Sequence, residues 1–368
     1  MITTETPIGK RLLSLDLFRG ATMFLLLGES AEVYRALTDA AGDSGFFHLV
    51  MQQFDHHPWN GLRFWDLIQP FFMFIVGVAM PLSLNKRLEK GESWNSVFRH
   101  ILFRCGMLFL FGTGLHCVYS GKLVWELWNV LTQLSFTVLV TFLLLRHTWK
   151  LQLGVSLGLL LLAEILYRVY DPAAPFVKDA NFGSWSDMLL MGKINNGGGW
   201  VTVNCISTAA HTIWGAMAGN FLLSAASQKE KIKTLLIFGG IGLFVGYSLD
   251  WLSITPIVKR IATTSFVFAS GGWALLTLTA MFWLVDVKGY QKSVFFFAVV
   301  GMNSIFIYIF ANIGAHWVDH LVHIFNDGVL GGIGFSPLFY NITNALLVWG
   351  IFWYLTYFLH KHKIYFRI

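Results

Sequence analysis

The sequence predicts an all-α fold, a polytopic integral membrane bundle of about ten transmembrane helices with both termini in the cytoplasm. Composition, the spacing of apolar stretches and the distribution of positive charge all lead to this prediction. Of the 368 residues, 55% are apolar and 12% are charged, whereas about a quarter of the residues in a soluble domain are charged. With a mean hydropathy of +0.60, the chain does not have the composition of a soluble globular protein.

Ten apolar stretches have the roughly 20 residues that a helix needs to cross about 30 Å of hydrocarbon. The sequence shows no convincing internal repeat, so we expect one transmembrane domain over residues 1–368. The first stretch carries charges and lacks a small-residue cleavage site, which favours a helix that is its own insertion signal. The stretches cover residues 14–36, 65–84, 98–118, 124–145, 151–170, 201–225, 234–254, 264–285, 293–315 and 337–359.

The orientation follows from Lys and Arg, which are retained in cytoplasmic loops. If the chain starts inside, 18 of its 26 Lys and Arg residues fall on cytoplasmic segments and eight on the opposite side. The terminal segments contribute Lys10, Arg11 and Arg367 to the larger group. Topology therefore explains the pI of about 9.2, and no nucleic acid partner is expected, because such proteins concentrate their basic residues in one stripe.

Ionisable residues within membrane spans are costly, and they usually face a cavity or a partner. For Asp66 and Glu164, access to interfacial water explains the charge as well as a functional site does. Glu29 and Asp250 lie deeper or nearer to other polar groups, which makes them better site candidates. The acidic residues without a partner nearby in the sequence are Glu29, Asp66, Glu126, Glu164 and Asp250.

A polar segment, His56-His57-Pro58-Trp59-Asn60-Gly61, stands immediately before the second apolar stretch. In the expected topology it lies at the extracytoplasmic mouth of that span, at the end of an outer loop over residues 37–64. An imidazole at the water boundary is suited to acid–base chemistry near neutral pH. Taken alone, however, His56 is more simply explained as a hydrated loop histidine.

Several blocks follow one another along nearly the whole chain: 11–20 (RLLSLDLFRG), 59–62 (WNGL), 66–67 (DL), 74–77 (FIVG), 285–289 (VDVKG) and 301–305 (GMNSI), with Tyr308 after them. In this order they resemble the heparan-α-glucosaminide N-acetyltransferase family of membrane acyltransferases. The resemblance is nearest to the bacterial NagX-like branch of that family. The ordered set is much more specific than any single block.

The resemblance implies transfer of an acetyl group from cytosolic acetyl-CoA to the amine of glucosamine, free or terminal on an oligosaccharide, on the extracytoplasmic side. The family's catalytic histidine stands three residues before the tryptophan of the WNGL block, which is His56 here. His56 would act either as the general base or as a transient acetyl carrier, and the sequence leaves both routes open. Asp55 and Asp66 are alternative residues to orient its ring.

Two positions depart from the family pattern. Where the family commonly has an asparagine ten residues after the glycine of the first block, this chain has Ser30, preceded by Glu29. A serine can donate one hydrogen bond but cannot reproduce an amide, so either Glu29 takes over this role or the acceptor differs. The Gln-Arg pair that many members carry in the fourth span is replaced by Thr132 and Gln133. Acyl transfer stays the expectation, and the acceptor stays open.

On the acceptor side, Trp59, Trp128 and Trp200 lie where a sugar ring can stack. Asn60, Asp66 and Asp250 complete the candidate acceptor residues.

On the donor side, Lys288 and Lys292 are candidates for the CoA phosphates, although positive-inside topology alone also explains them. Asn303 and Ser304 are candidates to line the donor cavity, or they are polar residues that hold helices together. Gln133, at the departing position in the fourth span, completes the donor candidates.

No metal is expected. His316, His320 and His323 have a spacing that would align them on one helical face, as in a zinc site, but no second ligand set accompanies them. An interfacial amphipathic helix explains their spacing better.

Two alternatives remain at this point. An amino-sugar or N-acetylglucosamine transporter would use His56, Glu29 and Asp250 to couple protons to its substrate. An acyltransferase acting on another envelope sugar, amine or hydroxyl would share the same donor. We expect the bacterial cytoplasmic (inner) membrane as the location, and the resemblance favours a homodimer.

Overall fold

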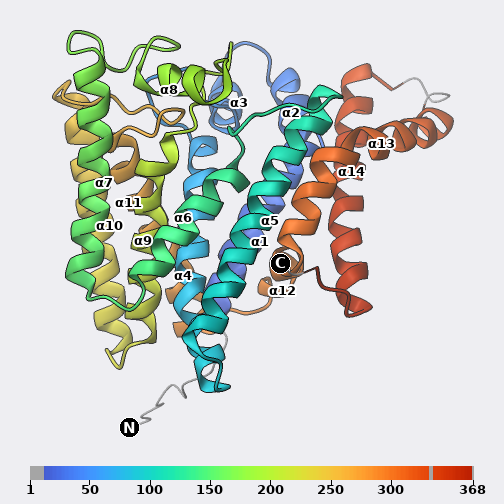
Figure 1. The fold of residues 1–368 in the computed structure, drawn as a ribbon. Coiled ribbons are helices and arrows are strands. Elements are labelled where there is room, and N and C mark those ends of the chain that lie inside the picture. The colour runs from blue at the N-terminus through green and yellow to red at the C-terminus, as the bar shows by residue number, and fades with distance from the viewer. Residues whose placement is uncertain (1–11, 331–334, 367–368) are drawn as a thin grey trace. The chain divides into compact units, whose positions relative to one another are not determined.

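The computed structural model describes residues 12–330 and 335–366, and every regular element in these ranges is helical (Figure 1), which confirms the predicted fold class there. Lys10, Arg11 and Arg367, which support the expected topology, lie outside the described residues. The α-helices are α1 (Leu13–Ser30), α2 (Val33–Ala41), α3 (Phe46–Met51), α4 (Ile68–Glu89), α5 (Trp94–Ser120), α6 (Val130–Leu144), α7 (Trp149–Tyr170), α8 (Phe182–Met191), α9 (Asn204–Leu223), α10 (Gln228–Trp251), α11 (Thr264–Met281), α12 (Val294–Met302), α13 (Ser304–Leu330) and α14 (Pro337–Lys361). Three short elements are the 3₁₀ turns η1 (Gln52–Phe54) and η2 (Phe64–Leu67) and the π-helical turn η3 (Phe282–Val287).

Seven helices in the described ranges are long and apolar enough to cross a membrane, as expected for a multi-pass protein. Each of the ten expected stretches contains a helix, but α1, α6 and α9 do not reach the same combination of length and apolar character. The count of ten and the orientation of the termini therefore stay predictions. The seven are η2 with α4, α5, α7, α10, α11 with η3, α13 and α14.

The first expected stretch, 14–36, is divided into two helices. α1 ends at Ser30, and Glu32 adopts a left-handed backbone with φ of 59° before α2 begins. Such a conformation cannot continue a right-handed helix, so the apolar pattern runs past the end of the element.

The ninth expected stretch, 293–315, is broken at Asn303, between α12 and α13. The Asn303 side chain is fully buried, donates to the Ile364 carbonyl (3.0 Å) and accepts from the Phe366 N–H (3.0 Å). The break in the helix thus anchors the chain that follows α14.

The chain divides into two compact units, each discontinuous in sequence. Unit 1 consists of residues 69–290 with two short pieces, residues up to Leu15 and Pro58–Leu62. Unit 2 consists of Asp16–His57, Arg63–Ile68 and the residues from Gln291 onward. The polar segment before α4 therefore contributes to both units.

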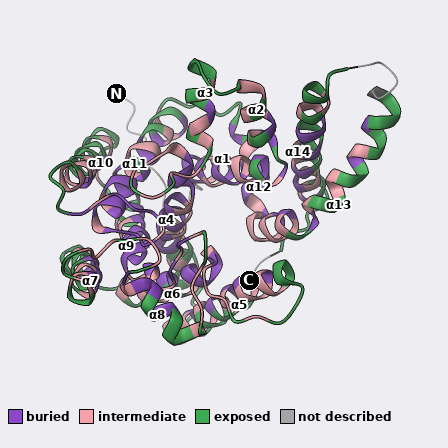
Figure 2. Ribbon diagram, turned by 90° about the horizontal axis from the view of Figure 1, so that it is seen from above, coloured by how far each residue is buried: buried purple, intermediate pink, exposed green. Residues whose placement is uncertain are grey.

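In unit 1, α9 is largely buried, as its purple ribbon in Figure 2 shows. A Cβ added at Gly77 of α4 would lie 2.0 Å from the Thr212 carbonyl oxygen, and one at Gly215 of α9 would lie 2.1 Å from the Phe74 carbonyl oxygen. The two backbones therefore touch, which only glycine allows at these positions.

The aspartate of the VDVKG block holds the start of the first helix. Asp286, in η3, accepts hydrogen bonds from the backbone N–H groups of Leu13 (3.2 Å) and Ser14 (3.1 Å). These donors have no partner within their own helix. Asp286 thus caps α1 from a position far along the chain.

In unit 2, α1 packs closely against α12 and α14. A Cβ at Gly20 would lie 1.9 Å from the Phe297 carbonyl oxygen. The Trp349 indole donates to the Phe24 carbonyl (3.0 Å), and the two rings stack at 4.3 Å. The glycine of the first block is therefore a contact point between helices.

Candidate active site

His56 and Asp66 form a hydrogen-bonded pair within unit 2. Asp66 lies in η2, the 3₁₀ turn that leads into α4, and His56 lies in the preceding loop. The Nδ1 atom of His56 is 3.0 Å from Oδ1 of Asp66. The Asp66 side chain is 1% exposed and that of His56 is 34% exposed. The pair joins a buried carboxylate to an imidazole that is partly accessible.

The carboxylate of Asp66 also fixes the loop and the state of the ring. Its Oδ2 accepts hydrogen bonds from the backbone N–H groups of His57 (3.2 Å) and Arg63 (3.0 Å). Because a carboxylate only accepts, Nδ1 of His56 carries the hydrogen that points to Oδ1. Neutral His56 therefore has its lone pair on Nε2, as required of a general base or a nucleophile.

Arg63 and Asp55 hold the backbone around the histidine. The Arg63 guanidinium donates to the His56 carbonyl (3.2 Å) and pairs with Asp55 at 3.5 Å. Asp55 accepts from the His56 N–H (2.8 Å) and is 79% exposed. Of the two acidic residues proposed to orient the imidazole, Asp66 contacts the ring and Asp55 contacts the main chain.

Glu29 joins this site through an aromatic cluster. The indole of Trp65 donates to Oε1 of Glu29 (2.8 Å), and Trp65 is 2% exposed. The Tyr34 ring packs edge-on against Trp65 (4.9 Å) and stacks on Phe54 (4.7 Å). Burial, and then the nearby charge of Glu29, raise the pKa of the Tyr34 phenol well above its usual range. Because Trp65 immediately precedes Asp66, η2 orients Glu29 and His56 together.

Comparison with known proteins matches residues 11–189 to the family described as "Heparan-alpha-glucosaminide N-acetyltransferase, catalytic". Two relatives carry the name heparan-alpha-glucosaminide N-acetyltransferase. The human protein is 25% identical over 370 residues, which cover 81% of this chain and 52% of the human one. The mouse protein is 28% identical over 154 residues, which cover 40% of this chain and 21% of the mouse one.

Residues 11–189, just under half of the chain, therefore resemble the catalytic part of the heparan-alpha-glucosaminide N-acetyltransferase family. The chain's alignments span about half of the human relative and less of the mouse one. The predicted resemblance to this family is confirmed, and the bacterial branch within it stays a prediction. The matched range includes Glu29, His56 and Asp66.

The WNGL block lies in unit 1. The Trp59 indole donates to the Phe176 carbonyl (3.0 Å), and a Cβ at Gly199 would lie 2.9 Å from its ring. The Gly61 N–H donates to the Ile257 carbonyl (2.8 Å). Asn60, between them, is exposed. The Trp59 ring therefore packs against the loop that contains the Gly197–Gly199 turn.

Trp200 and Asp250, two further acceptor candidates, also lie in unit 1. The Lys259 ammonium is 5.4 Å from the centre of the Trp200 ring. Asp250 accepts from the Ile257 N–H (2.8 Å), so its carboxylate shapes the loop after α10. Trp128, the third indole considered for sugar stacking, donates to Asp187 (2.7 Å). Each of these side chains has a structural partner.

Ser30, at the position where the family commonly has asparagine, is the last residue of α1 and is half-buried. Its side chain makes no hydrogen bond to other residues that the structure describes. Its neighbour Glu29 instead accepts from the indole of Trp65, the residue before Asp66.

The donor candidates fall in both units, Gln133 and Lys288 in unit 1 and Lys292, Asn303 and Ser304 in unit 2. Asn303 uses both ends of its amide on the chain after α14, and Ser304 begins α13 beside it. Lys288 is exposed and lies 5.5 Å from the Trp283 ring centre, and Lys292 is also exposed. Their roles in binding the donor stay predictions.

Gln133 is buried in α6, where its side-chain oxygen accepts from the amide of Gln69 in α4. Its own Nε2 is buried without a hydrogen-bond partner among the described residues. Within those same residues, no group of three or more His, Cys, Asp or Glu side chains is arranged to hold a metal ion.

A second histidine–carboxylate pair was not predicted. In unit 1, His116 Nδ1 lies 2.7 Å from Glu126, whose other oxygen accepts from Lys193 (2.7 Å). Burial raises the pKa of Glu126, but the hydrogen bonds and charges of Lys193 and His116 outweigh it and lower the pKa below its usual value. The available signal was the spacing, since His116 precedes Glu126 by ten residues, as His56 precedes Asp66.

Proposed function

We propose that this protein is a multi-pass membrane acyltransferase that moves an acetyl group from acetyl-CoA to the amine of glucosamine, free or at the end of an oligosaccharide. The observation that carries the proposal is the His56–Asp66 pair at 3.0 Å, which lies within the residues that match the family. The names of the human and mouse relatives supply the reaction class. The proposed location is the bacterial inner membrane, with the acceptor on the extracytoplasmic side.

In the first proposed route, His56 is the general base. A glucosamine amine is largely protonated near neutral pH, and it must lose a proton before it attacks the thioester carbonyl. Nε2 of His56 takes that proton, while Nδ1–H stays bonded to Asp66. The buried carboxylate stabilises the imidazolium ion that forms, and this ion gives its proton to the CoA thiolate that leaves as the C–S bond breaks.

In the second proposed route, Nε2 of His56 attacks the thioester carbonyl and releases the CoA thiolate, which leaves acetyl-imidazole. The unprotonated amine then attacks this acyl group, the bond between the acyl carbon and Nε2 breaks, and Nε2 takes the proton that the amine gives up. Such a route gives ping-pong kinetics. Asp66 fixes the same nitrogen for both routes, so kinetics rather than geometry distinguishes them.

The remaining candidates have proposed binding roles. Glu29, held by Trp65, binds the ammonium group of the acceptor, and Ser30 assists it. Trp59, Asn60, Asp66, Asp250 and Trp200 contribute to acceptor binding. Lys288, Lys292, Asn303, Ser304 and Gln133 contribute to donor binding. A homodimer is the proposed assembly.

The test is CoA release by the purified full chain with acetyl-CoA and glucosamine, with the product identified by mass. We expect acetylated glucosamine from the wild type and a rate about 10²–10⁴-fold lower from a folded His56→Ala variant. Uptake of N-acetylglucosamine into sealed vesicles without any use of acetyl-CoA would instead support a transporter. Turnover only with another amine or hydroxyl acceptor would retain acyl transfer and change the substrate.

A further inference from the structure

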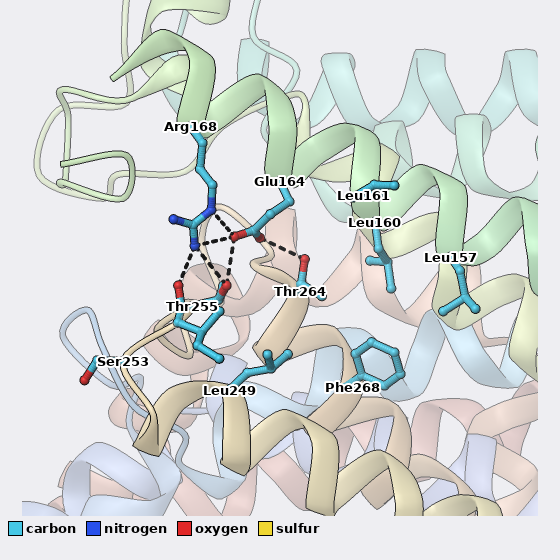
Figure 3. Close-up of a pocket in the computed structure, with 11 residues that line it drawn as sticks. Leu157, Leu160, Leu161, Glu164, Arg168, Leu249, Ser253, Thr255, Thr264 and Phe268 are labelled. Carbon is cyan, nitrogen blue, oxygen red and sulfur yellow. Dashed lines mark hydrogen bonds and ion pairs between the residues drawn. The ribbon is translucent and has the colours of Figure 1, made fainter. Parts of the chain in front are cut away.

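A groove of about 430 Å³ opens on unit 1 between α7, α10 and α11 (Figure 3). Apolar side chains form most of its length, and a charged pair lies toward one end. Of the 18 most apolar consecutive residues in α7, only 22% are buried, and the share is also 22% in α10. Both helices therefore present long faces to the membrane. The apolar lining comes from Leu157, Leu160, Leu161, Leu249 and Phe268.

The polar end is built around Glu164 and Arg168 of α7. Glu164 accepts hydrogen bonds from Arg168 Nε (2.8 Å), from the Thr255 hydroxyl (2.8 Å) and from the Thr264 hydroxyl (3.0 Å). Arg168 Nη2 bonds to the Ile254 carbonyl and lies 3.4 Å from the Thr255 hydroxyl. Both oxygens of the carboxylate are therefore occupied, as the dashed lines in Figure 3 show.

One nitrogen of the Arg168 guanidinium, Nη1, takes no part in these hydrogen bonds. Within residues 12–330 and 335–366, Arg168 Nη1 has no hydrogen-bond partner, and the side chain is 41% exposed. Its two N–H groups therefore remain as donors. Guanidinium groups match phosphate oxygens in geometry and charge, so this end of the groove suits an anionic phosphate.

The groove has the depth of one membrane leaflet. Leu157 and Arg168 are eleven residues apart in α7, which is about 16 Å along a helix axis and close to half of the roughly 30 Å hydrocarbon core. Arg168 lies two residues before the end of α7, and Leu157 lies near its middle. The charged end is thus at headgroup level and the leucine wall points toward the bilayer centre.

We propose that this groove binds one acyl chain of an anionic membrane phospholipid, with the phosphate against Arg168 Nη1. A polar soluble ligand would leave the leucine wall without a partner, and an uncharged chain would leave Nη1 without one. An acyl chain is as well solvated in the bilayer as in the groove, so selectivity must come from the headgroup. One Arg near an anionic lipid surface is worth about 1 kcal/mol, or roughly fivefold.

The test measures lipid retained by the purified full chain from micelles containing equal phosphatidylglycerol and phosphatidylcholine, by native mass spectrometry. We expect about fivefold more phosphatidylglycerol on the wild type. Leu157→Trp, at a residue 41% exposed, fills the groove without touching the charged pair and should abolish retention of both lipids. Leu162→Trp, at a residue of the same helix that is 45% exposed and outside the groove, is the matched control and should retain them.

Two substitutions test the headgroup contact. Arg168→Gln should bring the ratio of the two lipids to about one, whereas Arg168→Lys, which keeps the charge, should preserve a preference for phosphatidylglycerol. Equal retention of both lipids by the wild type would refute the preference for an anionic headgroup and overturn the proposal. Equal loss in Leu157→Trp and Leu162→Trp, or retention of an isoprenoid-linked lipid in place of phospholipid, would also overturn it. Lipid retention does not depend on acetyl transfer, so neither result decides the other.

Discussion

Asp66→Asn replaces one carboxylate oxygen by an NH2 group of nearly the same size. The amide oxygen can accept from the N–H groups of His57 and Arg63, which lie at 3.2 and 3.0 Å in the wild type, only if the NH2 group faces His56 Nδ1. Nδ1 must then accept, and the ring hydrogen moves to Nε2. The opposite orientation sets two backbone donors against an NH2 group, at a cost of about 1–3 kcal/mol for each unsatisfied group. The loop therefore stays folded while His56 takes the wrong tautomer.

The expected loss of rate follows from this tautomer. General base catalysis contributes typically about 10²–10⁴-fold, and a ring with hydrogen on Nε2 cannot provide it. We expect kcat and kcat/KM to fall together by this factor in Asp66→Asn, because the lost interaction operates in the transition state. His56→Ala should fall as far, and the double variant no further, because the two residues act as one unit.

The assay is the initial rate of CoA release with acetyl-CoA and glucosamine. Asp55→Asn is the matched control, because this carboxylate accepts from the main-chain N–H of His56 (2.8 Å) and not from its ring. Its kcat should stay within about threefold of the wild type. If Asp66→Asn kept the wild-type kcat, or if Asp55→Asn lost as much, Asp66 would not act through the tautomer of His56.

Three predictions concern stability. Gly77→Ala places a methyl group 2.0 Å from a backbone oxygen of α9 and should destabilise the folded protein by about 1–3 kcal/mol or more. Gly240→Ala, whose methyl group would have nothing within 4 Å, should not destabilise it. Equal thermal midpoints for the two variants would contradict the contact. Asp286→Ala removes the acceptors at the start of α1 and should cost about 1 kcal/mol, seen as faster amide hydrogen exchange in the first turn; unchanged exchange would count against the cap. Burial raises the pKa of Glu126, but Lys193 and His116 outweigh it and lower the pKa below its usual value. The stabilisation of the folded state by ionised Glu126 is therefore present above the unfolded pKa of about 4.3 and is lost as the pH falls through the lower folded pKa. Thermal midpoints from about pH 6 to about pH 3 should therefore drop more in the wild type than in Glu126→Gln, and parallel curves would argue against the pairing.

Apolar runs located the helices well and their ends poorly. All ten expected stretches contain helix, because about 20 consecutive apolar residues leave few alternatives. The run 14–36 does not reveal that Glu32 turns left-handed, and the run 293–315 does not reveal that Asn303 bonds the chain after α14. Both breaks depend on local backbone geometry or on residues far along the chain, which hydropathy does not record.

The candidate site could also be predicted only in part from the sequence. The histidine position followed from its family block, whereas the choice between Asp55 and Asp66 required the 3₁₀ turn that buries Asp66 and aims it at the ring. Nothing in the sequence pairs Trp65 with Glu29, because the 36 residues between them leave their distance open. The sequence likewise does not reveal that the carboxylate of Asp250, a candidate site residue, accepts from the Ile257 N–H.

The discontinuity of unit 2 has a consequence for biosynthesis. Its first part ends at Ile68 and its last part starts at Gln291, so residues 69–290 are synthesised between them. At about 5–20 residues per second, α1 waits on the order of tens of seconds before α14 brings Trp349 to the carbonyl of Phe24. Throughout that interval, lipid or the insertion machinery must cover the face of α1 against which α14 will pack. The packing of α1 in unit 2 is therefore completed only after nearly the whole chain has been synthesised.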